Sequence, residues 1–395
     1  MRRNGFRLGA LLALLVLPLA TGARAATDFK VHGLLDLVGS EIGEGYELNL
    51  LARGDSNWDP YALRLMVDAD VMDHLSVYTQ FIARDQVPPY IQGAYVMYSP
   101  SSSRDFHVLA GKIPSAVGTY APRTYSNHNP LIGTPLMYQY HSTLIWYDFP
   151  PSTDALLKTR GSGQYGVNYR GFKVGMGMAT IDDSWWDVGV TVTGSARPIE
   201  YAAGVTAGTP GWGNPAKDEN SGKSVLGRVG LTPWPALRIG VSGSYGPYLV
   251  DGLNPKLPAG KKATDYNQIL GMADFELLVG HAELRAEGAY NRWQSPIVGN
   301  LDSRSGYAEL KYGFSFGGYL AGRYDVLRFS EITSSAGVTL PWDADVSRYE
   351  VGAGYRMNRS VLAKLVYQST TQELGPPGAL DRHPSLVGGQ LSVLF

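Results

Sequence analysis

The chain has 395 residues, of which 34 are basic and 35 acidic, and it has no cysteine. A chain with nearly balanced charges lacks the excess of basic residues that is typical of nucleic-acid-binding proteins. The absence of cysteine excludes disulfides, thiolate metal sites and covalently attached c-type haem. Glycine (48 residues) and tyrosine (25) are frequent while only 17% of residues are charged, which is typical of many short strands joined by tight turns.

The first 25 residues have the layout of a secretory signal peptide. Arginines precede an apolar run over residues 8–20, and Ala23-Arg24-Ala25 is a small-x-small cleavage site. About thirteen apolar residues are too few to span a bilayer, which needs roughly 20. We therefore predict export with cleavage after Ala25. Loss of four arginines leaves 30 basic residues (34 − 4) against 35 acidic ones in a single domain, residues 26–395.

From residue 29 onward, hydrophobic residues recur at every second position. In "HAELRAEGAYN" (residues 281–291), Leu284 and Ala286 alternate with Glu283 and Arg285. This alternation predicts strands with one apolar and one wet face. We predict an all-β fold of about 18 strands, with a range of 16–20. The predicted strands are 29–39, 60–72, 74–84, 89–98, 105–112, 163–170, 172–180, 185–194, 199–207, 223–232, 236–246, 267–278, 281–292, 305–314, 316–328, 346–356, 360–370 and 385–395.

The connections between these strands alternate between short turns and long loops. Short turns on one rim and long loops on the other are typical of a transmembrane antiparallel β-barrel. An even number of strands places both termini on the short-turn rim, which is the periplasmic side. A secreted soluble β-sandwich is the alternative. Aromatic residues at many strand ends favour the barrel, because such residues form girdles at the two membrane interfaces.

The last nine residues, "VGGQLSVLF" (387–395), alternate and end on Phe395. A terminal strand left unpaired would be an open sheet edge, which lipid does not tolerate. We therefore expect segment 385–395 to pair with segment 29–39 and close the barrel.

With its signal peptide, its alternating strands and its final "LSVLF", the chain resembles the Gram-negative general porin class of outer-membrane β-barrels. The resemblance implies that Phe395 is the assembly signal read by the barrel-assembly machinery. It also implies a place in the bacterial outer membrane, among outer-membrane lipids and lipopolysaccharide, with a homotrimer as a candidate assembly.

The connection over residues 113–162, the third on the long-loop rim, is much longer than the others. "GKIPSAVGTY" (111–120) resembles the exit of the fifth strand in porins, after which the loop folds into the channel. The resulting candidates for a constriction are Lys112, Arg123, Tyr125, Asn127, His128 and Tyr138. The alternative is an extracellular flap held on the rim by Leu131, Ile132, Leu136 and Met137. Structureless loops of this length are uncommon without a role, which favours the inward fold.

The wet faces of the predicted strands carry nearly equal numbers of cations and anions. The cationic candidates are Arg64, Arg170, Lys173, Arg228, Arg238, Arg285, Lys311, Arg323, Arg348, Arg356 and Lys364. The anionic candidates are Asp36, Asp68, Asp70, Asp187, Glu200, Asp274, Glu276, Glu283, Glu287, Glu309, Asp325 and Glu350. This balance departs from the uncompensated Arg and Lys ladder expected of a phosphate-selective pore. We expect many of these charges to pair across strands.

We therefore expect a weakly selective, water-filled channel for passive diffusion of small polar solutes or ions. The seven histidines show no metal-ligand spacing and no nucleophile elbow is present, so we expect no enzyme, no metal and no cofactor. A Ser–His pair on the exterior, as in the smaller outer-membrane phospholipases, is a weak enzymatic alternative. The main alternative is the barrel sheath of a porin–cytochrome electron conduit, with a multihaem cytochrome as partner. A surface receptor or adhesin is the third.

Overall fold

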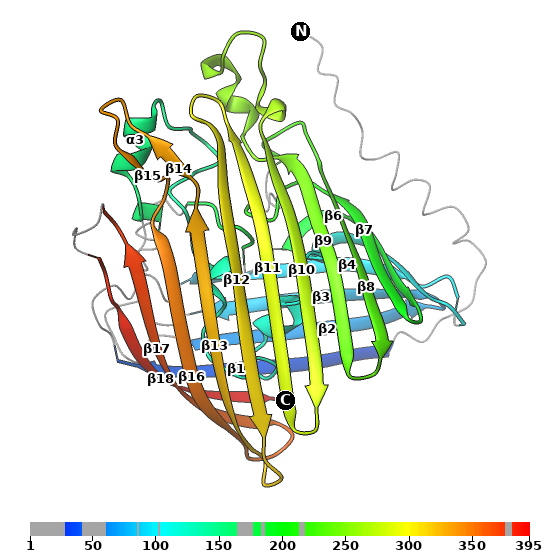
Figure 1. The fold of residues 1–395 in the computed structure, drawn as a ribbon. Helices are drawn as coiled ribbons and strands as arrows, with labels where there is room; N and C mark the ends of the chain where they lie inside the picture. Colours follow the sequence, from blue (N-terminus) through cyan, green and yellow to red (C-terminus); the bar gives the residue numbers. More distant parts are fainter. Residues whose placement is uncertain are drawn as a thin grey trace.

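The computed structural model describes residues 28–41, 61–84, 87–101, 103–163, 177–182, 186–212, 218–375 and 381–395. The predicted signal peptide, residues 1–25, lies outside these ranges. The described chain is almost entirely β, and Figure 1 shows its strands wrapped into a closed barrel. The barrel strands are β1 Asp28–Ser40, β2 Tyr61–Met72, β3 Leu75–Arg84, β4 Val87–Tyr98, β5 Asp105–Pro114, β6 Trp186–Ala196, β7 Ile199–Thr206, β8 Ser224–Trp234, β9 Leu237–Pro247, β10 Asn267–Val279, β11 Ala282–Ser295, β12 Gly299–Gly313, β13 Gly318–Phe329, β16 Asp345–Arg356, β17 Val361–Glu373 and β18 Ser385–Leu394.

Each barrel strand is antiparallel to its neighbours in the sequence, and β1 pairs with β18 to close the cylinder. Backbone hydrogen bonds continue through the last residue, since Phe395 N–H donates to the Gly33 carbonyl at 2.9 Å and Gly33 N–H donates to the Phe395 carbonyl at 2.7 Å. The described barrel therefore has no open edge, as the alternating C-terminal segment predicted. The assembly role of Phe395 stays a prediction.

The barrel has 16 strands, at the lower end of the predicted range. The predicted strands 163–170 and 172–180 fall mostly outside the described residues. Among the described strands, β5 pairs directly with β6 from Asp105↔Ser195 to Pro114↔Trp186. The connection after the fifth strand is consequently longer than predicted and runs from residue 115 to residue 185.

The alternation of side chains separates an apolar exterior from a polar interior. On β16, Tyr349 and Val351 are about half exposed on the outside of the barrel, whereas Arg348 and Glu350 are fully buried. The same division holds on β11, where Leu284 is exposed and Glu287 is buried. An exterior of this kind is stable in hydrocarbon and not in water, because large apolar side chains are exposed all around the cylinder.

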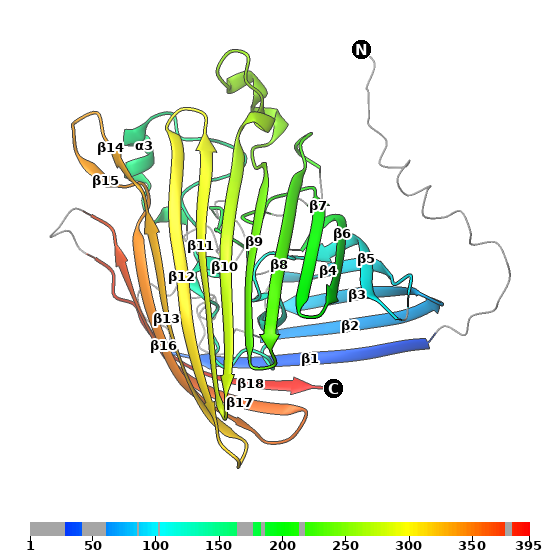
Figure 2. The ribbon, with the colours of Figure 1, turned by 45° about the vertical axis from the view of Figure 1, so that its right-hand side comes forward.

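Short turns and long connections lie at opposite ends of the barrel (Figures 1 and 2). Two-residue turns join β2 to β3, β8 to β9 and β10 to β11. The long connections carry short helices and a small hairpin, but no described helix is long and apolar enough to cross a membrane. These elements are η2 Ala121–Thr124, α2 Leu136–Gln139, α3 Thr153–Lys158, η4 Asp251–Lys256, η5 Ala263–Asp265, and the hairpin of β14 Glu331–Thr333 and β15 Thr339–Pro341.

Candidate functional site: an interior narrowed by one connection

Residues 115–145, hereafter the inner loop, lie against the inside of the barrel wall. This part of the connection from β5 to β6 contacts inward side chains of β1, β2, β3, β9, β11, β12, β13, β16 and β17 through hydrogen bonds. Most of its residues from Tyr120 to Ser142 are buried, including Tyr120, Leu131 and Leu136. Because buried backbone groups need partners, a loop without regular structure must take them from the wall.

Carboxylates on the wall accept hydrogen bonds from the inner loop. Glu350 Oε1 accepts from the backbone N–H groups of Ile132 at 3.2 Å and Gly133 at 2.8 Å. Asp325 Oδ1 accepts from the N–H of Leu136 at 3.1 Å, at the first turn of α2. Each ionised acceptor strengthens the hydrogen bond that it receives, so these pairs hold the loop against β13 and β16.

Glu287 on β11 binds two separate parts of the inner loop. One carboxylate oxygen accepts from Thr119 Oγ1 at 2.6 Å and the other accepts from the Tyr138 hydroxyl at 2.6 Å. The loop can converge on this carboxylate because Gly118, with φ of +71°, lacks a side chain. A Cβ there would lie 2.4 Å from the Tyr138 hydroxyl oxygen.

Cations on the wall bind the carbonyl oxygens of the same loop. Lys364 on β17 donates to Ser126 at 2.5 Å and to Leu131 at 3.1 Å. Arg323 on β13 donates to the Gly133 carbonyl at 2.8 Å, and Arg348 donates to Gln139 Oε1 at 2.6 Å. Wall residues of both signs therefore satisfy the loop backbone and fix its position.

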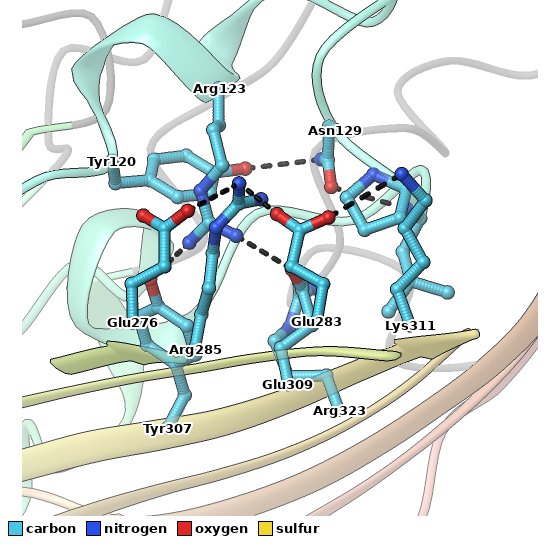
Figure 3. Close-up of polar contacts among 12 residues, drawn as sticks. Tyr120, Arg123, Asn129, Glu276, Glu283, Arg285, Tyr307, Glu309, Lys311 and Arg323 are labelled. Carbon is cyan, nitrogen blue, oxygen red and sulfur yellow. Dashed lines mark hydrogen bonds and ion pairs between the residues drawn. The ribbon is translucent and has the colours of Figure 1, made fainter. Parts of the chain in front are cut away.

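Arg123 is the only charged residue of the inner loop, and it points toward the wall (Figure 3). Its guanidinium donates to Glu309 Oε1 at 2.6 Å and to the Tyr307 hydroxyl. The guanidinium carbon also lies 5.0 Å from the centre of the Tyr120 ring, a cation–π distance. The one cation of the loop is therefore bound to β12, and the loop presents no charge to the remaining open space.

The wall charges pair with one another as well as with the loop. Arg323, which has no exposed side-chain surface, lies 2.7 Å from Glu350, 3.2 Å from Asp325 and 3.3 Å from Glu309. Toward the short-turn rim, Figure 3 shows a second chain of alternating charge, Glu276–Arg285–Glu283–Lys311. Arg323 and its three carboxylates are buried, and burial of these charges is tolerated only because each has an opposite partner.

The other predicted constriction and wall residues occupy varied positions. Lys112 donates to the Ile91 carbonyl on β4 at 2.9 Å. Tyr125 donates to Gln80 Oε1 at 2.6 Å, Asn127 accepts from Arg356 through its carbonyl at 3.1 Å, and His128 is exposed.

On β2, the three predicted wall residues differ in depth. Arg64 is buried and lies 3.2 Å from Asp36 of β1. Asp68 is in register with Tyr78 of β3, and Asp70 is exposed near the short turn, where it accepts from Ser76. Arg64 also donates a 3.4 Å hydrogen bond to the Thr124 carbonyl of the inner loop.

Sequence reasoning missed the uncharged wall residues that bind the inner loop. Gln80 accepts from Tyr125, Ser242 accepts from the N–H of Gly118 at 3.0 Å, and the Tyr307 hydroxyl accepts from Arg123. The alternation does place all three on inward positions, but a search for charged residues passes over them. Uncharged polar residues at inward positions of the alternation would have identified these partners of the inner loop.

The inner loop leaves a cavity of about 690 Å³ along one side of the barrel. Residues 115–122 form one side of it, and these residues carry no charge. The opposite side is the inner wall of β4 to β9, which includes the aromatic residues Tyr95, Trp186 and Tyr201. The titratable lining residues include Asp105, His107, Asp182, Glu200, Arg228 and Arg238.

Most of those lining charges are neutralised in place. Glu200 lies 3.0 Å from Arg228 and accepts from Arg238 Nε at 2.8 Å. Arg228 also pairs with Asp274. His107 Nε2 lies 2.8 Å from Asp105 Oδ1, near the short-turn rim. Ion pairs on the wall and the uncharged residues 115–122 therefore border much of the open space.

Asp343, in the connection before β16, binds both the end of the inner loop and the chain that follows it. Its carboxylate accepts from the N–H groups of Thr143 at 2.8 Å, Gly161 at 2.6 Å and Ala344 at 2.7 Å. Burial raises the pKa of Asp343 from 3.8 to about 6, even though these donors favour the ionised form.

A pH titration of unfolding should report this group. Because the folded-state pKa is raised, the contribution of Asp343 to stability is fully present below the unfolded pKa of 3.8 and is lost as pH rises through about 6. We expect the melting temperature of the wild type to fall between pH 5 and pH 7 relative to Asp343→Asn, whose side chain does not titrate. Melting curves of the two proteins in detergent that shift in parallel with pH would contradict this assignment.

The chain resembles known proteins in its fold and not in its sequence. No protein-family model matches the chain, and no curated protein matches its sequence. Solved structures do match its fold. A trimer form of the outer membrane protein OmpT of Vibrio cholerae is 12% identical, with a TM-score of 0.54 over 94% of this chain and 100% of that chain.

Two porins match equally well. An anion-selective porin from Comamonas acidovorans is 10% identical, with a TM-score of 0.56 over 93% of this chain and 100% of that chain. OmpF of Salmonella typhi, solved with daunomycin, is 11% identical, with a TM-score of 0.53 over 93% and 97%. Sequence identities this low indicate a shared fold and do not indicate which solute passes through the barrel. The chain has the closed 16-strand fold of the outer-membrane porin class.

Proposed function

We propose that the protein is a porin of the bacterial outer membrane, through which small polar solutes or ions diffuse passively. The observation that carries this proposal is the cavity of about 690 Å³ beside the inner loop, within a barrel whose exterior is apolar and whose interior is polar. Barrels of 16 to 18 strands are too wide for side chains alone to fill. Diffusion through such a space needs no catalytic residue, metal or cofactor.

Weak selectivity is the second part of the proposal. Selectivity for ions of one sign follows from rings of charge of the opposite sign. Here the cations Arg228 and Arg238 share the anion Glu200, and Arg228 also contacts Asp274. The electric fields of these opposite charges therefore nearly cancel at the position of a passing ion.

A reversal-potential measurement tests this selectivity. In a planar bilayer with a KCl gradient, we expect the refolded wild type to give a reversal potential close to zero. Glu200→Gln should shift the potential toward anion selectivity, because it leaves two cations without their shared anion. Glu331→Gln, on the exposed hairpin strand β14, is the matched control and should not shift it. A strongly selective wild type would contradict the proposal.

The barrel sheath of an electron conduit is the competing function. A sheath must hold a cytochrome in its interior, whereas here the inner loop occupies that interior and is hydrogen-bonded to residues on both sides, such as Asp36 of β1 and Glu350 of β16. We therefore favour the diffusion pore over the sheath as the function of this barrel.

The surroundings of the porin form the rest of the proposal. We infer that the long connections face the outside of the cell and that both termini are periplasmic, with lipopolysaccharide and lipid against the apolar exterior. A homotrimer is the assembly that we propose, in line with the trimer form of the OmpT structure. Crosslinking in outer-membrane vesicles would test the assembly independently of conductance.

A further inference from the structure

Three arginines lie on the outside of the barrel, at the end opposite the two-residue turn between β10 and β11. Figure 2 shows β11, β12 and β13 side by side, and these strands carry Arg292, Arg304 and Arg328 in turn. Arg304 shares one face of β12 with the exposed Leu310, and Arg328 shares one face of β13 with the exposed Tyr324. Because alternate residues of a strand face the same way, these arginines are on the lipid side of the wall.

The arginines lie where the apolar band of the exterior ends. On β12 the exterior positions from Tyr312 to Gly306 are uncharged, and Arg304 is the next exterior position. At about 3.4 Å per residue and a tilt of about 40°, the segment from Tyr312 to Arg304 (312 − 304 = 8 residues) rises roughly 21 Å. Apolar bands of outer-membrane barrels are about 25 Å tall. Arg304 is therefore at the level of the lipid headgroups, where a cation costs little.

The carboxylates near these arginines leave one cation uncompensated. Arg292 and Asp302 form two contacts, from Nε at 2.7 Å and from Nη2 at 2.8 Å. Arg328 Nε lies 3.7 Å from Asp345 Oδ2. Arg304 is exposed, and it forms no ion pair with any carboxylate in the part of the chain that the structure describes.

Arg304 is also directly opposite Arg328 in the register of β12 and β13. Like charges in this position repel and destabilise a sheet. Arg328 is held beside Arg304, because its Nη1 donates to the carbonyl of Val346 at 2.8 Å and to that of Leu327 at 3.1 Å. An anion between the two guanidinium groups would remove the repulsion, and the fork of an arginine matches the oxygens of a phosphate.

On the bilayer side of these arginines, the exterior consists of small residues. Gly288 of β11 is opposite Gly306 of β12, and Ala286 is opposite Ala308. None of these four residues, hereafter the small-residue surface, has a side chain beyond Cβ. Tyr324, which is half exposed, is in register with Ala308 and borders the surface. A hydrocarbon chain can lie close to the backbone here, whereas a free phosphate ion would make no use of this surface.

We propose that Arg304 and Arg328 together bind a phosphate group of lipopolysaccharide, with an acyl chain of the same molecule on the small-residue surface. The arginines complement the charge of the phosphate, and the adjoining apolar surface favours a lipid over a free ion. A phosphate monoester carries more charge than the phosphodiester of a glycerophospholipid, so it compensates both arginines better. The inference rests on the outer-membrane location and orientation given under the proposed function, which place this end of the barrel in the outer leaflet.

Native mass spectrometry tests this site, because the mass of each adduct identifies the lipid. The refolded barrel is titrated in neutral detergent with diphosphoryl lipid A, phosphatidylglycerol or phosphatidylcholine at equal mole fractions. We expect diphosphoryl lipid A to be retained about tenfold more strongly than either glycerophospholipid, because it places more negative charge between the two arginines.

Variants assign the binding to this face of the barrel. Arg304→Gln and Arg328→Gln should each weaken retention of diphosphoryl lipid A about tenfold, since each removes one charged donor. Ala308→Phe should also weaken it, because the ring covers the small-residue surface while both arginines stay. Arg359→Gln removes an exposed arginine from the turn between β16 and β17, at the opposite rim, and is the matched control with no change expected.

The outcomes separate this inference from the proposed function. Retention of lipid A no stronger than that of phosphatidylcholine, or equal retention by the wild type, Arg304→Gln and Arg328→Gln, overturns the site. Equal retention of phosphatidylglycerol and lipid A overturns the assignment to lipopolysaccharide. Conductance of the same preparations in a planar bilayer is recorded in parallel. A conducting barrel that does not retain lipid A leaves the porin proposal intact, whereas a barrel that retains lipid A and conducts no ions overturns the pore and supports the lipid site.

Discussion

Deletion of residues 118–145 is expected to raise the single-channel conductance about twofold or more, since a barrel of this strand number without an internal segment leaves a wide aqueous channel. In the intact protein the inner loop reaches from Ser242 on one side of the interior to Asp36 on the other. Replacement of the segment by a short Gly-Ser linker would open the space that it occupies. Single-channel recording of the refolded variant measures the change.

The wall should tolerate this deletion. Arg323 keeps Glu350 and Glu309 as partners, and the carboxylate of Glu287 would face water instead of Thr119 and Tyr138. Removal of residues 256–262 from the connection between β9 and β10 is the matched control. Figure 2 shows that connection projecting beyond the rim, so its loss should leave conductance unchanged. Equal conductance of both deletion variants and the wild type would contradict a narrowing role for the inner loop.

The architecture was predictable from the sequence because it depends on a local period. Alternation of apolar and polar residues decides which side chains face lipid, and it correctly divides Tyr349 and Val351 from Arg348 and Glu350. Strand count depends on pairing between distant segments, which alternation does not encode. Segment 163–180 has the composition of two strands, yet the described strands before and after it, β5 and β6, pair directly with each other.

The described end of that segment shows where such a sequence can pair instead. Met178 exchanges backbone hydrogen bonds with the inner loop, accepting from Ser142 at 3.0 Å and donating to Leu144 at 2.7 Å. An extended segment needs a partner for its N–H and C=O groups, and another loop segment serves as well as a barrel strand. Nothing in the local pattern distinguishes the two partners.

The candidate site was predictable in part for the same reason. Glu287, Arg323, Asp325, Arg348 and Glu350 are on inward positions, as their alternation predicts. Their partners could not be read from the sequence, because several are backbone groups of the inner loop, which carry no side-chain signature. The prediction that wall charges pair across strands describes Arg323 with Glu350 but misses the N–H groups of residues 132 and 133 that bind Glu350.

Ala286→Arg should cost roughly 2–4 kcal/mol of unfolding free energy in phospholipid vesicles, the range for a cation near the bilayer midplane. Ala286 lies in the middle of β11, in register with Phe275 of β10 and Ala308 of β12. The next residue across the sheet, Tyr324 of β13, is half exposed on the exterior, so the arginine would enter lipid and not the polar interior.

Ala259→Arg is the matched substitution in water. Ala259 is exposed in the connection between η4 and η5, where a charge keeps its hydration, and no measurable loss of stability is expected. Urea unfolding of both variants in the same vesicles gives the comparison. If Ala286→Arg were as stable as Ala259→Arg, the apolar face of β11 would not lie in hydrocarbon, and a diffusion pore across a membrane would lose its physical basis.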